Sequence, residues 1–217
     1  VALREANAQY TQCDVDFENK PDWFTKVNPA GKIPAITYGG PVVPPSDPSP
    51  ESIKLAESLV LLEFIAELYP AAGLMPSDPV QSAQVRLFVS TIDGVLFPAM
   101  LAWILGTGAV EGVVSALKAV QAVLEEHGQG PYFLGERFSI ADIALVPFYK
   151  RLVLITQKRI GADKRGEEHT GVVRRALESS ELARLRNYAD RLMERPSVGE
   201  KFDEVSTNDD GSARMFC

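Results

Sequence analysis

The sequence predicts an α/β domain followed by an all-helical domain. Short apolar stretches with strand character, separated by turn residues, occur in the first 56 residues. A linker rich in glycine and proline follows at Ala71–Pro79. Beyond it, apolar residues recur at the three- and four-residue spacing of helices, and no strand pattern is found. We therefore expect two domains, at residues 1–75 and 79–217.

The composition excludes several classes of protein. A chain of 217 residues suits one or two compact domains, and its net charge of −7 disfavours nucleic acid or an anionic membrane as the main partner. The longest apolar runs, such as Leu59–Ile65, are too short to span a bilayer. Two cysteines make no disulfide framework and suggest a reducing compartment, so we expect a cytoplasmic protein.

The first part of the chain alternates helices and strands. Val1–Ala6 is expected to be the second half of a helix that begins upstream. Tyr10–Phe17 alternates imperfectly and is assigned as a strand. Pro21–Val27 is a short helix with its proline in the first turn, and Ile33–Tyr38 is the next strand.

The rest of this domain is a loop, a strand and a helix. Gly39–Glu51 contains five prolines and is expected to be a rigid surface insertion. Ser52–Ala56 is a short strand. Leu59–Tyr69 is apolar on most faces, so we expect a largely buried helix.

Three helices are predicted first in the second domain: Val80–Ile104, Val110–His127 and Ser139–Ile155. The last begins with Ser139 and Asp142 in the spacing of a capping box, which is a folding element.

The end of the chain is predicted to contain one further helix. Lys158–Gly171 is charged and contains glycine, so we expect a mobile loop. Glu181–Glu194 is the last helix, and Thr207–Cys217 is a loose polar tail.

The stretch Asn28–Ile36 combines turn residues with a strand that contains Pro34. Proline removes a ladder donor, so a central strand should not tolerate it there. One resolution is a cis Ile33–Pro34 bond, which would turn the Ile33 N–H and C=O outwards to pair with an extended peptide.

Glu57 and Ser58 stand where the next helix begins. They are either an ordinary helix cap with an acid in the first turn, or an anion site beside a carboxylate. The second arrangement would match the carboxylate and ammonium of an amino-acid head group.

Four motifs together resemble the glutathione transferases over roughly Ala2 to Val198. The run Asn19–Phe24 resembles the omega class and the omega-like fungal members most, and Arg137–Ile143 resembles the family's helical-domain signature. The other two motifs are Asn28–Ile36 and the Glu57-Ser58 pair.

The resemblance implies a thioredoxin-like first domain and a homodimer. The family's first strand is missing from this sequence, so we expect the functional protein to have residues before Val1. The thiol-activating residue would lie there and would be Cys or Ser. A cysteine favours thiol transfer or deglutathionylation, and a serine favours conjugation. Cys13 does not replace it, since we expect a small core residue at that position.

Six residues are implied as glutathione contacts. The glycine carboxylate would pair with a lysine, the cysteinyl residue would pair with backbone, and the γ-glutamyl head group would lie at the helix start. These residues are Lys20, Lys32, Ile33, Pro34, Glu57 and Ser58. For Lys32 an ordinary solvated side chain is an equal interpretation.

A second, hydrophobic substrate would lie beside glutathione. Its candidate contacts are Phe97, Met100, Trp103 and Tyr149, of which Trp103 is preferred because an aromatic plane suits flat ligands. Each of them can also be an ordinary core or dimer-interface residue. His127 and His169 have no partner at metal-ligand spacing, so no metal site is expected.

The resemblance thus implies a detoxification enzyme with glutathione as its substrate. It would join glutathione to hydrophobic or aromatic electrophiles, or catalyse thiol transfer. The alternative is a ligandin, a non-catalytic carrier of aromatic small molecules. The motifs do not identify the second substrate.

Overall fold

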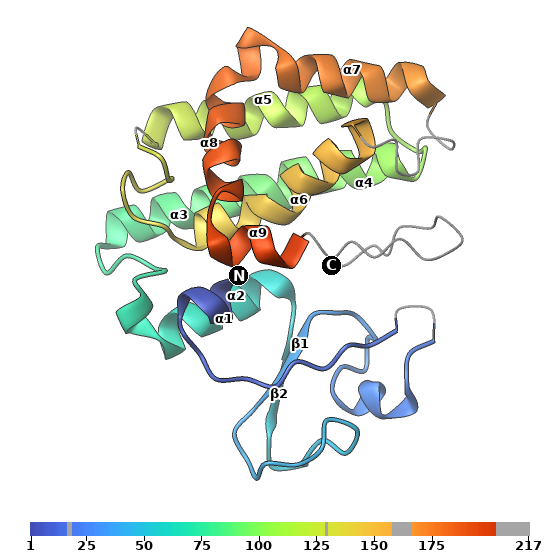
Figure 1. Ribbon diagram of the computed structural model, residues 1–217, viewed down its shortest axis with the longest axis vertical. Coiled ribbons are helices and arrows are strands. Elements are labelled where there is room, and N and C mark those ends of the chain that lie inside the picture. The colour runs from blue at the N-terminus through green and yellow to red at the C-terminus, as the bar shows by residue number, and fades with distance from the viewer. Residues whose placement is uncertain (17–18, 129, 158–165, 203–217) are drawn as a thin grey trace. The chain divides into compact units, whose positions relative to one another are not determined.

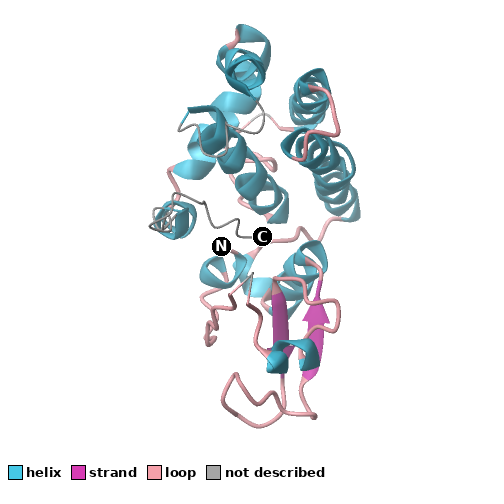
Figure 2. Cartoon of the chain, turned by 90° about the vertical axis from the view of Figure 1, so that its right-hand side faces the viewer, coloured by secondary structure: helices cyan, strands magenta, loops and turns pink. Residues whose placement is uncertain are grey.

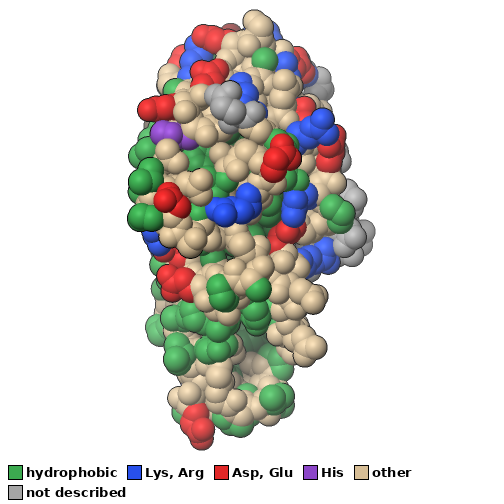
Figure 3. Space-filling view, turned by 90° about the vertical axis from the view of Figure 1, so that its left-hand side faces the viewer, with side chains coloured by type: hydrophobic (Ala, Val, Ile, Leu, Met, Phe, Trp, Pro, Cys, Tyr) green, Lys and Arg blue, Asp and Glu red, His purple; other side chains and the backbone are tan. Residues whose placement is uncertain are grey.

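A computed structural model describes residues 1–16, 19–128, 130–157 and 166–202. The chain divides into two compact units, one covering Ala2–Ala72 and the other beginning at Gly73 (Figure 1). On the face drawn in Figure 3, charged side chains concentrate on the helical unit and hydrophobic ones on the first unit.

The first unit contains a two-stranded antiparallel sheet and short helices (Figure 2). Residues Ala35 to Tyr38 of β1 pair with Ala56 to Ile53 of β2. The elements in order are α1 (Ala2–Glu5), the 3-10 helix η1 (Asp22–Lys26), β1 (Ala35–Tyr38), β2 (Ile53–Ala56), α2 (Ser58–Leu68) and the 3-10 helix η2 (Pro70–Ala72). The predicted short helix and the strands on either side of the proline-rich loop are confirmed.

Helix α2 packs against the sheet through one stripe of its surface. Leu61, Ile65 and Ala66 are buried, and Phe64 meets the Tyr38 ring edge-on at 5.3 Å. Val60 is 54% exposed and most of the other apolar residues of α2 are half-buried, so the helix is less buried than predicted. The two-stranded sheet and the short helix α1 together cover only part of the surface of α2.

The predicted strand at Tyr10–Phe17 is also wrong, as far as it is described. Residues 10–16 form no strand, and Phe17 lies outside the described residues. Side chains from Tyr10 through Asp14 are exposed, so no apolar face anchors a strand register there. Cys13 is accordingly exposed, which corrects the expectation of a core residue.

The second unit is a bundle of helices (Figure 1). The three long helices expected between Val80 and Ile155 are confirmed, and the last predicted helix corresponds to η5 and α8. The elements are α3 (Pro79–Thr91), the π-helix η3 (Ile92–Leu96), α4 (Phe97–Ile104), α5 (Val110–His127), α6 (Ile140–Gln157), α7 (Gly166–Glu178), the 3-10 helix η5 (Ser180–Leu182), α8 (Ala183–Met193) and α9 (Pro196–Phe202).

Helix α7 was not expected from the sequence. The predicted loop Lys158–Gly171 is helical from Gly166, and its residues 158–165 lie outside the described part of the chain, as does the predicted tail. Helix α7 contains many charged residues. Its apolar face is therefore narrow and consists of a few residues such as Val173 and Leu177, both buried.

Helices α3, η3 and α4 form one continuous rod. The Phe97 N–H bonds to the Ile92 carbonyl five residues back, immediately before Pro98, which lacks an N–H. The rod Pro79–Ile104 is long and apolar enough to span a membrane by length and composition, contrary to the sequence-based expectation. Core helices pass the same test. Ile92, Leu96 and Met100 of this rod are buried in the bundle, although only 28% of its most apolar 18-residue stretch is buried.

A buried carboxylate fixes the start of α6. Asp142 accepts hydrogen bonds from the Ser139 N–H (2.7 Å), the Ser139 hydroxyl (2.9 Å), the Phe133 N–H (2.8 Å) and the Tyr188 hydroxyl (2.6 Å). Burial raises the pKa of Asp142, which these four donors oppose. The predicted folding role of Ser139 and Asp142 therefore extends to α8 through Tyr188.

Candidate functional site

The antiparallel register collects most of the candidate glutathione contacts at one end of the sheet. Ala35 lies opposite Ala56. Pro34 directly precedes the first of these residues, and Glu57 directly follows the second. Ile33-Pro34 and Glu57-Ser58, which are 24 positions apart in the sequence, are thus neighbours at the same sheet end.

The turn before Pro34 is held by the side chain of Asn28, which is 6% exposed. Its Nδ2 donates to the Lys32 carbonyl at 2.7 Å, and its Oδ1 accepts from the Ala30 N–H at 3.1 Å. The Gly31 N–H donates to the Asn28 carbonyl at 2.8 Å. Asn28 therefore sets the backbone path into Ile33, a positioning role that the sequence analysis missed because asparagine is common in turns.

The Ile33–Pro34 peptide bond is cis, the conformation that the sequence left open. Both residues are half-buried, and Pro34 lies outside β1, which begins at Ala35. The proline therefore removes no donor from the β1–β2 ladder.

The two candidate lysines lie near this turn. Lys20 is half-buried, and its Cδ is 3.9 Å from the position that a Cβ on Gly31 would take. Gly31 has a φ of +63°, which suits glycine. Lys32 is exposed within the turn itself. Two lysines therefore lie close to Ile33 in the chain's folded path.

The start of α2 has the features of an anion site. Glu57 is the N-cap residue and makes no side-chain capping hydrogen bond, while Ser58 is the first helical residue. The interpretation of Ser58 as an ordinary cap is therefore wrong. Both side chains are exposed. The N–H groups of the first helical turn have no acceptor within a helix, so they can bind a carboxylate.

Glu57 also has an unusual backbone conformation, with φ 70° and ψ 111°. Residues other than glycine rarely adopt a positive φ, and such conformations gather at functional sites. The observation favours a role for Glu57 beyond that of a solvated acid.

The four candidates for a hydrophobic substrate have different surroundings in the second unit. Met100 and Trp103 are 1% and 2% exposed, as expected for core residues. Phe97 is half-buried and packs against Phe148, with ring centres 5.3 Å apart. Tyr149 is buried and lines a pocket between helices of the second unit. For Met100 and Trp103 the structure favours core packing over ligand contact.

No group of three or more potential metal ligands occurs in the described ranges.

Comparisons with known proteins match both units. Residues 1–73 match the family model "Glutathione S-transferase, N-terminal domain", and residues 105–191 match "Glutathione S-transferase, C-terminal domain". The crystal structure of glutathione transferase Omega 1C from Trametes versicolor is 46% identical with a TM-score of 0.86, covering 94% of this chain and 84% of that one.

Two further proteins, one from a fungus and one from a plant, are similar to this chain. Glutathione transferase Omega 2S from Trametes versicolor, in complex with 2,4-dihydroxybenzophenone, is 38% identical with a TM-score of 0.83, covering 94% of this chain and 84% of that chain. Glutathione S-transferase U25 of Arabidopsis thaliana is 32% identical over 69% of this chain. The alignment spans 64% of the length of that relative.

Proposed function

The chain belongs to the glutathione S-transferase family, and from this premise we propose that its first unit binds glutathione at the end of the sheet. The observation that carries the proposal is the β1–β2 register, which brings Ile33-Pro34 and Glu57-Ser58 together. Glutathione lies extended along the backbone at Ile33. Its γ-glutamyl end lies on one side of this residue and its glycine end on the other.

The γ-glutamyl end belongs at the start of α2. Its carboxylate accepts hydrogen bonds from the first N–H groups of the helix and from the Ser58 hydroxyl. Its ammonium pairs with the carboxylate of Glu57. The exposed side chains of both residues and the unused cap position support this assignment.

The glycine end belongs at the lysines. Lys20, which lies against the turn at Gly31, pairs with the glycine carboxylate, and Lys32 assists it. The Asn28 hydrogen bonds keep the backbone between these two ends in one conformation, so little ordering is needed when the ligand binds.

We assign the bound thiol to transferase chemistry. A thiol acts as its thiolate, which a hydrogen bond or positive field at the sulfur stabilises. In the family pattern this donor is a Cys or Ser. Its identity decides between thiol transfer, with deglutathionylation, and conjugation to hydrophobic electrophiles.

The second candidate function is that of a non-catalytic carrier of aromatic molecules in the cytoplasm. This candidate is supported by the Trametes versicolor Omega 2S structure, in which a similar protein is in complex with the aromatic molecule 2,4-dihydroxybenzophenone. The protein should therefore be assayed with a conjugation substrate and a thiol-transfer substrate, and titrated with this benzophenone. Turnover supports the enzyme, whereas tight binding of the benzophenone with negligible turnover supports the carrier.

The glutathione site itself is tested by retention on immobilised glutathione. The double variant Glu57→Ala, Ser58→Ala should pass through a column that retains the unaltered protein, because both partners of the head group are removed. Lys26→Ala, at an exposed lysine of η1, is the matched control and should be retained. Equal retention of the double variant would refute the assignment.

The expected homodimer also has a candidate surface. Five large apolar side chains are exposed on the rod formed by α3, η3 and α4 and at the residue that follows it. They are Val80, Leu87, Val95, Leu101 and Leu105. Covering such a row with a second copy would remove its apolar area from water.

A further inference from the structure

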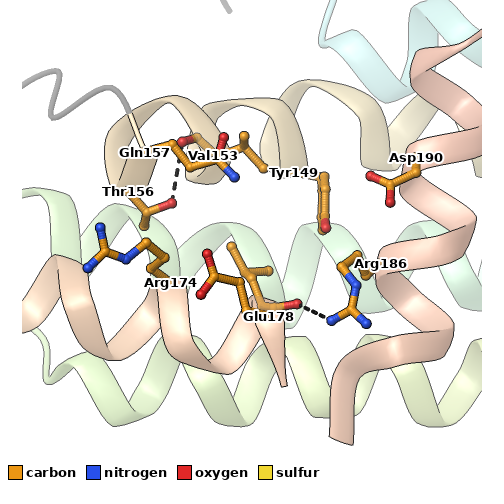
Figure 4. A pocket seen from close by; sticks show the side chains of 9 residues that line it. Tyr149, Val153, Thr156, Gln157, Arg174, Glu178, Arg186 and Asp190 are labelled. Carbon is orange, nitrogen blue, oxygen red and sulfur yellow. Dashed lines mark hydrogen bonds between the residues drawn. The ribbon is translucent and has the colours of Figure 1, made fainter. Parts of the chain in front are cut away.

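A pocket of about 310 Å³ opens between the second half of α6, the second half of α7 and α8 (Figure 4). Its floor consists of buried side chains, namely Tyr149, Thr156 and Leu177. Its rim carries exposed charged side chains, among them Arg174, Glu178 and Asp190. The volume is at the lower end of the range of small-molecule sites. All of these residues belong to the second unit, whereas the proposed glutathione contacts belong to the first.

The floor presents the hydroxyl of Tyr149 to the pocket. Tyr149 is 4% exposed, and its hydroxyl makes no hydrogen bond to the described residues. Figure 4 shows this hydroxyl pointing into the space between the three helices. Because this hydroxyl opens into the pocket, it can donate to water or to a ligand atom there. The geometry therefore points to a ligand atom that accepts from Tyr149.

The protonation state of Tyr149 suits such a donor. Burial, reinforced by the Asp190 carboxylate and opposed by Arg186, raises the pKa of Tyr149 to about 12. The phenol is then uncharged at physiological pH and carries a proton to donate.

The charges around the pocket balance. Helix α7 contributes Arg174 and Glu178 to the lining, and α8 contributes Arg186 and Asp190, so a ligand with net charge of either sign meets both attraction and repulsion. Arg186 is partly engaged already, since its Nη1 donates to the Leu177 carbonyl at 2.8 Å and to the Ser179 carbonyl at 2.9 Å. The lining therefore favours an uncharged ligand.

The remaining wall is suited to a flat ring. The Tyr149 ring, Val153 and Leu177 provide apolar contact. The Thr156 hydroxyl donates to the Leu152 carbonyl at 2.7 Å, so its oxygen can accept a hydrogen bond from the ligand.

We propose that this pocket is a second binding site, separate from glutathione, for a small uncharged aromatic compound bearing hydroxyl groups. One ligand oxygen accepts from Tyr149, a second hydroxyl donates to Thr156 or the rim carboxylates, and the ring lies against Val153 and Leu177.

The test uses the full chain with labelled valine and leucine methyl groups, observed by NMR, and resorcinol as the probe. The methyl signals of Val153 and Leu177 should shift saturably, and saturating glutathione should leave the shifts in place. Benzoate, a charged ring of similar size, should bind several-fold more weakly. No saturable shift up to about 10 mM resorcinol, displacement by glutathione, or equal binding of benzoate would each overturn the proposal.

Two variants distinguish the contribution of the Tyr149 hydroxyl to binding from an effect on folding. Tyr149→Phe keeps the ring and should weaken resorcinol binding about three- to tenfold, while Tyr69→Phe in the first unit should not. If Tyr149→Phe fails to fold, the exposed Glu178→Lys changes the charge balance of the rim and should move the preference toward benzoate. Unchanged affinity in a folded Tyr149→Phe, or unchanged preference in Glu178→Lys, would contradict the proposed contacts.

Discussion

Ala35 of β1 lies opposite Ala56 of β2. Directly beyond both residues, the backbone leaves the regular strand conformation. On one strand the neighbour is Pro34, after a cis bond, and on the other it is Glu57, with a φ of 70°. The two departures from regular geometry thus occur side by side at one sheet end. The proposed glutathione site is built on the register of Ala35 with Ala56.

Glu57→Gln should raise the Kd for glutathione about tenfold. The amide keeps the shape of the side chain but loses the charge that pairs with the γ-glutamyl ammonium. Calorimetric titration provides the measurement. Glu67→Gln makes the same change at an exposed position of α2 and should leave the Kd unchanged. Equal effects of the two variants would indicate a general loss of charge and not a specific contact.

Asn28→Ala should destabilise the first unit by about 1–3 kcal/mol, because the Lys32 carbonyl and the Ala30 N–H each lose a partner. Glutathione binding should weaken as well, since the backbone before Ile33 becomes less ordered. Urea unfolding and calorimetry measure the two effects. Asn187→Ala, at an exposed position of α8, serves as the control. If stability falls while the Kd stays constant, Asn28 has no positioning role.

Asp142→Ala should destabilise the helical unit by at least about 3 kcal/mol. Four donors, two of them backbone N–H groups, would lose a shared acceptor in a buried site. Tyr188→Phe removes only one of these donors and should cost less. Thermal unfolding followed by circular dichroism distinguishes them, and a larger loss in Tyr188→Phe would contradict the account of the network.

The exposed apolar row on the α3–α4 rod predicts a homodimer. Light scattering after size-exclusion chromatography should give twice the 23.7 kDa mass of the chain. Leu87→Glu should restore the monomer mass, because a charge would enter the covered surface. Val42→Glu, on the loop of the first unit, should not. A wild-type mass of 23.7 kDa would exclude the dimer.

Local signals were sufficient for much of the fold. Turn chemistry predicts the turn at Asn28. Apolar spacing predicts the strand that ends at Tyr38 and the helices between Pro79 and Gln157. The strand assigned near Cys13 failed because its alternation was weak and strand formation depends on a pairing partner. Helix α7 was missed because its charged residues resemble those of a loop.

The candidate site was predictable as a set of motifs but not as geometry. The positive φ of Glu57 and the bonds of Asn28 to Lys32 are results of the folded backbone. Met100 and Trp103 were indistinguishable from ligand contacts in the sequence, since apolar residues at helical spacing occur in cores and pockets alike. The pocket at Tyr149 needs three helices that are brought together only by folding.

The most direct measurement of the central claim is a crystal structure of the full-length protein with glutathione bound. We expect the γ-glutamyl head group at Glu57 and Ser58, the cysteinyl backbone paired with Ile33, and the glycine carboxylate at Lys20. Glutathione bound elsewhere, or bound here with its glycine end away from Lys20, would contradict the account.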